Sequence, residues 1–79
     1  MSYGERIAEI ARENHLFCDV VEESGNVVVV EIEWGDWKHE HARLDWLVKS
    51  QMPELKEVTK EITDEDGSDC YSAIHRFVF

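Results

Sequence analysis

Residues 27–50 read VVVVEIEWGDWKHEHARLDWLVKS, and this stretch decides the fold. Its first part, Val27–Trp34, is rich in β-branched residues, which is typical of a strand. Gly35 marks a turn, and Asp36 is a good N-cap whose charge suits the start of a helix. Beyond this turn the spacing predicts a helix, which Pro53 ends because proline cannot continue the hydrogen-bond ladder. The inward stripe of the helix is Trp37, His41, Leu44, Leu47 and Val48.

The preceding residues predict the other half of a β-hairpin. Leu16–Glu22 forms its first strand, and Glu23–Asn26 contains the turn. With a three-residue loop, Ser24–Asn26, the core face carries Leu16, Cys18, Val20, Val28, Val30, Ile32 and Trp34. The opposite face then carries Phe17, Asp19, Val21, Glu23, Val27, Val29, Glu31 and Glu33. A two-residue loop is the alternative and would shift the pairing by one residue; the three-residue loop separates polar from apolar side chains better.

The two ends of the chain complete a single domain. Met1–His15 has a helical pattern, with a capping box formed by Ser2 and Glu5. Asp69–Phe79 alternates as a strand, whereas Leu55–Thr63 fits a strand better than a helix, with Asp64–Ser68 as the turn between them. The order α-β-β-α-β-β predicts one α+β domain over residues 1–79, with a mainly antiparallel sheet and both helices on one face.

The charge of the chain limits its partners. Eighteen acidic side chains oppose eight basic ones, for a formal net charge of −10. Direct binding to nucleic acid or to anionic membranes needs a basic surface, so neither is expected. The chain shows no signal peptide, and its longest apolar run, Val27–Val30, is far too short to span a bilayer. We therefore expect a cytoplasmic protein with free thiols at Cys18 and Cys70, a disulfide between them being the alternative.

The residues that could bind a metal ion are poorly spaced for that purpose. His39 and His41 point about 200° apart on a helix, and Cys70 and His75 point to opposite faces of a strand. The acidic turn around Asp66 and Gly67 resembles part of a calcium loop, but Ile62 would occupy its first ligand position. No histidine is fixed beside either cysteine to activate a thiolate. The sequence predicts no metal, no cofactor and no catalytic residue.

The remaining lead is a surface that is partly acidic and partly apolar, a combination typical of protein interfaces. The predicted protein-binding residues are Phe17, Asp19, Val21, Glu22, Glu23, Val27, Val29, Glu31, Glu33, Asp64, Glu65, Asp66 and Asp69. In size and charge the chain is similar to small acidic phage-encoded inhibitors such as some anti-CRISPR proteins, a likeness of composition alone.

These observations predict a non-enzymatic interaction module that binds another protein with a basic surface, such as a nucleic-acid-binding protein whose usual ligand it imitates in charge. One alternative is a homodimer that associates through the sheet. The other is a small metal- or thiol-dependent enzyme.

Overall fold

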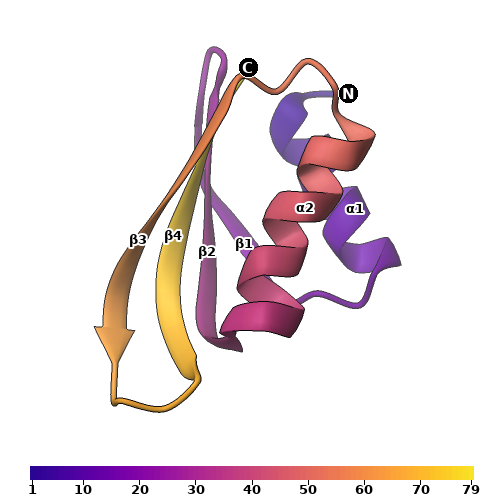
Figure 1. The fold of residues 1–79 in the computed structure, drawn as a ribbon. Coiled ribbons are helices and arrows are strands. Elements are labelled where there is room, and N and C mark those ends of the chain that lie inside the picture. Colours follow the sequence, from indigo (N-terminus) through magenta and orange to yellow (C-terminus); the bar gives the residue numbers. More distant parts are fainter.

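Two helices pack on one face of a four-stranded antiparallel sheet in the computed structural model, which describes residues 1–79 (Figure 1). The elements are α1 (Tyr3–Glu13), β1 (Asp19–Ser24), β2 (Val27–Asp36), the π-helical turn η1 (Trp37–His41), α2 (Ala42–Gln51), β3 (Glu57–Glu65) and β4 (Cys70–Val78). The sheet order β1-β2-β4-β3 joins two hairpins through their inner strands. The predicted α+β class and element order are confirmed, and the strand in Leu55–Thr63 is correct.

The core lies between the helices and the inner face of the sheet. Its side chains come from every layer: Ile7, Ile10 and Ala11 from α1, Leu44, Leu47 and Val48 from α2, and Val28, Val30, Ile32 and Phe77 from the sheet. The rings of Tyr3 and Phe79 stack with centroids 4.1 Å apart and close the end of this core. Neither helix has the length and apolar character that a membrane crossing requires.

Local chemistry fixes both ends of α1. The Ser2 hydroxyl accepts a hydrogen bond from the Glu5 amide, and the Glu5 side chain accepts one from the Ser2 amide, which confirms the capping box. At the other end His15 adopts a positive φ of 57°. The Leu16 amide donates to the Ala11 carbonyl and the His15 amide to the Arg12 carbonyl, the two bonds of a Schellman motif. The chain is thereby turned from α1 towards β1.

The turn of the first hairpin differs from the expected one. Ser24 pairs with Val27, so the loop has two residues, Gly25 and Asn26, rather than the predicted three. Gly25 has a φ of 61°, as the first central position of a type II′ turn requires. A bulge between Val20 and Glu22 then restores the pairing of Val20 with Val30. The predicted core face therefore survives around Val20, although Glu23, paired with Val28, shares the inner face instead of the outer one.

Trp34 and Trp37 were both predicted in the core, and both predictions are wrong. Trp34 is 45% exposed and Trp37 is 49% exposed. β2 contains a second bulge between Ile32 and Gly35, which breaks the alternation of inward and outward side chains just before Trp34. The helix also begins with a π-helical turn rather than α-helical spacing, so only the later part of the predicted stripe, from His41 onward, is buried.

Candidate functional site

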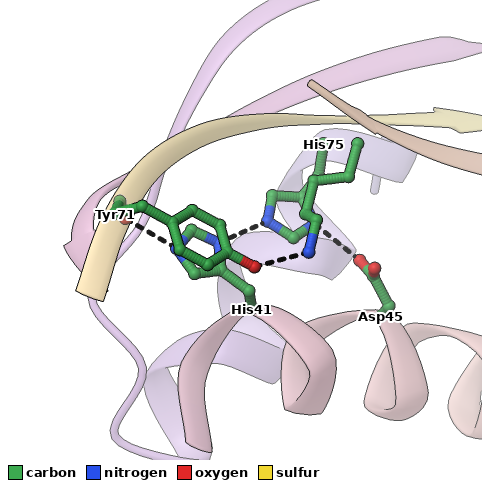
Figure 2. Close-up of polar contacts among 5 residues, drawn as sticks. His41, Asp45, Tyr71 and His75 are labelled. Atoms are coloured by element: carbon green, nitrogen blue, oxygen red, sulfur yellow. Dashed lines mark hydrogen bonds and ion pairs between the residues drawn. The ribbon is translucent and has the colours of Figure 1, made fainter. Parts of the chain in front are cut away.

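A buried network of side chains connects the start of the second helical segment to β4 (Figure 2). His41 ends η1 and His75 lies in the middle of β4, and both side chains are fully buried. The Nδ1 atom of His41 lies 2.9 Å from Nε2 of His75, and Nε2 of His41 lies 2.8 Å from the Tyr71 carbonyl oxygen. Nδ1 of His75 in turn lies 2.7 Å from a carboxylate oxygen of Asp45 on α2.

The partners of the network fix its protons. The Tyr71 carbonyl and an ionised Asp45 can only accept, so Nε2 of His41 and Nδ1 of His75 must both carry hydrogen. The bond between the two rings needs one more proton, so the network is fully hydrogen-bonded only when one of the two rings is protonated.

Burial disfavours a proton on His41 itself. Desolvation in the core lowers the pKa of His41, and the nearby positive charges of His75 and Lys60 lower it further, while the hydrogen bond to the Tyr71 carbonyl and the Glu40 charge act in the opposite direction. The Tyr71 ring stacks on His41 with centroids 4.2 Å apart (Figure 2). Lys60 on β3 donates a hydrogen bond to the Tyr71 hydroxyl. Every polar atom of the network is satisfied.

The network is closed off from solvent. Both imidazoles are completely buried. No group of three or more His, Cys, Asp or Glu side chains is arranged to hold a metal ion. Cys18 and Cys70 are free thiols, and burial raises the pKa of Cys18, which makes its thiolate less available. The bonds of His41 to Tyr71 and His75 tie η1 to β4.

The segment that the network holds is the tryptophan corner, which we define as Trp34–Trp37. Its first residue donates its amide to the Ser72 hydroxyl at 2.9 Å, and its last donates its amide to the Asp69 carbonyl at 3.1 Å. Between them Gly35 pairs with Tyr71, the same residue whose carbonyl binds His41. The Asp36 carboxylate caps η1 by accepting from the Lys38 and His39 amides, which lowers the pKa of Asp36. The corner is thus fixed at several points along the end of β4.

A second surface feature is an open groove of about 750 Å³ beside the end of α1, which we call the α1–β1 groove. Its residues come from α1, from the loop after it and from β1 and β2; they are Ala8, Ala11, Arg12, His15, Leu16, Phe17, Cys18, Asp19, Glu31 and Glu33. Phe17 is 86% exposed there. The structure therefore brings together four of the predicted protein-binding residues, Phe17, Asp19, Glu31 and Glu33.

The other predicted protein-binding residues are distributed over three places. Val21 occupies the β1 bulge and is exposed, whereas Glu22 and Glu23 lie near the opposite end of that strand, where Glu23 accepts a hydrogen bond from the Ser2 hydroxyl. Val27 and Val29 lie on the sheet face that no helix covers, but Val29 is only 9% exposed. The acidic residues of the second hairpin, Asp64, Glu65, Asp66 and Asp69, lie at the end of the sheet that carries the tryptophan corner.

Sequence reasoning missed the pairing of His41 with His75. The signal was present: each histidine occupies an inward position, one on the helix and one on a strand, and buried polar groups need partners. Asp45, four residues after His41 on the same helical face, could have been included for the same reason. Spacing along the chain relates His41 to His39 and His75 to Cys70, and does not relate the two buried histidines to each other.

The comparisons with known proteins leave the geometry as the only guide to function. No protein-family model, no curated protein and no solved structure matches this chain.

Proposed function

We propose that this protein is a non-enzymatic interaction module whose α1–β1 groove docks on a basic surface of another protein. The observation that carries the proposal is the position of Phe17, 86% exposed, in a groove that Asp19, Glu31 and Glu33 also line. A protruding aromatic side chain supplies contact area that can be desolvated, and interface energy is concentrated in such residues. The surrounding carboxylates supply complementarity to a basic surface.

The charge of the whole chain supports the same assignment. A net charge of −10 on 79 residues attracts a basic partner at long range and raises its association rate. Basic protein surfaces include those that hold nucleic acid, so an oligonucleotide should compete with this protein for its partner if the protein acts by imitating that charge. The cytoplasm is the compartment in which we expect this interaction, with both cysteines reduced.

Binding kinetics with a charge-matched pair of double variants test the proposal. The probe is an immobilised peptide of alternating lysine and leucine residues, which offers the positive charge and the apolar surface that the groove would meet. Glu31→Lys with Glu33→Lys changes the groove, whereas Glu57→Lys with Glu61→Lys makes the same charge change on β3, at the far edge of the sheet. We expect the groove variant to associate about 10-fold more slowly than the β3 variant, with the difference shrinking at high salt.

Two results would contradict the proposal. Equal association rates for the two double variants would show that total charge, not the groove, attracts the peptide. Phe17→Ser should speed dissociation, and an unchanged dissociation rate would remove Phe17 from the contact.

A homodimer is the second candidate, and one feature of the sheet favours it. On the face without helices Val27 of β2 pairs with Val78 of β4, and both side chains are only partly buried. Sedimentation of the protein and of Val27→Ser measures this association. A dimer that Val27→Ser dissociates would support the second candidate, whereas a monomer at all accessible concentrations would exclude it.

A further inference from the structure

We propose that the tryptophan corner, Trp34–Trp37, is a recognition site for arginine side chains of a partner protein. The inference goes beyond the groove proposed above, because its contacts are the two indole rings, although Glu33 lies beside both surfaces. It starts from the two indole rings: Trp34 is 45% exposed and Trp37 is 49% exposed in a chain whose core contains neither. Tryptophan is the residue type most enriched at energetically dominant contact points of protein interfaces.

The backbone at this corner is strained. Trp34 has a φ of 49°, a left-handed conformation that bulky residues other than glycine rarely adopt. It lies within the β2 bulge and is followed by the π-helical turn η1, and both kinds of irregularity concentrate at functional sites. A conformation of this cost persists only where surrounding interactions impose it.

Those interactions are present on the buried side of the corner. The Ser72 hydroxyl accepts a hydrogen bond from the Trp34 amide, and the Asp69 carbonyl accepts one from the Trp37 amide. Tyr71 pairs with Gly35, and its carbonyl oxygen is hydrogen-bonded to His41. Both Tyr71 and Ser72 are buried, so β4 offers a rigid support. The backbone that carries the two exposed tryptophans is therefore held in place before any partner arrives, which reduces the entropy lost on binding.

Charge selects the occupant. Glu33 precedes the corner, and the hydrogen bond between Trp37 and Asp69 places the acidic turn of the β3–β4 hairpin beside it. Lys38 is the only lysine or arginine among residues 33–40, and residues 64–70 contain none. Such a surface repels nucleic acid, anionic lipid and a second copy of this acidic chain. Arginine combines a positive charge, which carboxylates attract, with a flat guanidinium group that stacks on indole rings.

The experiment follows the indole N–H signals of the three tryptophans by NMR during titration with a peptide of alternating arginine and glycine. The two ends of the peptide are blocked and carry no charge. A lysine–glycine peptide of equal charge tests the preference for guanidinium. Trp46 on α2, 64% exposed, is the internal control because it is even more exposed than the other two tryptophans. Trp34→Gly removes one ring and also relieves the positive φ, Trp37→Ala removes the other, and Trp46→Ala is the matched control variant.

We expect the arginine peptide to shift the Trp34 and Trp37 signals and to leave Trp46 unchanged. Trp34→Gly and Trp37→Ala should each weaken binding by about 5-fold or more, as the loss of a cation–π contact implies, while Trp46→Ala binds like the unaltered protein. Equal shifts at all three tryptophans, or equal binding of the lysine peptide, would overturn the proposal. Because the readout is the indole signal itself, the result stands whether or not Phe17 and the groove carboxylates bind a partner.

Discussion

The Nδ1 atom of His41 and the Nε2 atom of His75 face each other across 2.9 Å in the interior of a strongly acidic protein. Around them lie Lys60 on β3, Tyr71 on β4, Glu40 beside His41 and Asp45 on α2. Only Asp45 provides a carboxylate in direct contact with the pair. The contribution of the pair to the free energy of unfolding depends on whether its rings are protonated, and it must therefore vary with pH.

The first prediction is that the protein loses stability in mild acid. Burial lowers the pKa of His41 below its ordinary value of 6.5, so the His41 imidazole binds a proton at a higher pH in the unfolded chain than in the folded protein. The stabilisation is complete above the unfolded pKa and declines as the pH falls towards the folded one. Urea unfolding at pH values from neutral to mildly acidic measures the decline. His41→Gln should reduce the dependence on pH, while His39→Gln, at an exposed position on the same turn, should retain it.

Asp45→Asn should destabilise the fold by about 1.5–3 kcal/mol, the range for a hydrogen bond to a charged group. The asparagine can still accept from His75, but its neutral oxygen is a weaker acceptor than the carboxylate. Asp64→Asn on the edge strand β3 is the control and should change the free energy of unfolding by less than about 0.5 kcal/mol. Equal losses for both variants would contradict the assigned role of Asp45.

Leu44→Ala and Trp34→Ala should differ strongly. Leu44 is fully buried beneath the sheet, so its truncation leaves a cavity and should cost about 2–5 kcal/mol. Trp34 is 45% exposed and should cost less than half as much, because water already contacts much of its ring. Denaturant unfolding of the two variants measures both losses of stability. Similar losses would contradict the difference in burial between Leu44 and Trp34.

Gly35→Ala should be destabilising by about 1–3 kcal/mol, the range for overpacking. A β-carbon at this position would lie 2.5 Å from the Cγ2 atom of Ile32, a fully buried side chain, and 3.0 Å from a carboxylate oxygen of Glu40. Gly25→Asn is the contrasting change: nothing lies within 4 Å of its β-carbon position, and asparagine tolerates the positive φ of 61°. Thermal unfolding should show a clear loss for Gly35→Ala and little change for Gly25→Asn.

The fold could be predicted from the sequence because its local signals agree with one another. The valine run, the Asp36 cap, Pro53 and the alternation of Asp69–Phe79 each correspond to an element of the structure. The errors arose where a bulge or a π-helical turn shifts the alternation by one residue, as at Trp34 and Trp37. No single residue in the sequence predicts such a shift, because the position of a bulge depends on how the strand pairs with its neighbour.

The site was less predictable than the fold for a related reason. Phe17, Asp19, Glu31 and Glu33 could be placed on one surface from their alternation, and the structure brings them to one groove. The histidine network, by contrast, joins η1, α2 and β4, whose relative positions no local pattern specifies. The hydrogen-bond partners of the buried histidines can be identified only from the three-dimensional arrangement of these elements.

The strand order has a consequence for how the chain folds. Each hairpin pairs neighbours in sequence, whereas the central pair β2–β4 brings Val27 against Val78, almost the full length of the sheet-forming chain apart. Local hairpins close in microseconds, but a distant pairing must first overcome the entropy of closing a long loop. Docking of the two hairpins should therefore set the folding rate, with α2 as the tether between them. Stopped-flow refolding should find that Val30→Ala, at the central junction, slows folding more than Val20→Ala on the outer strand does.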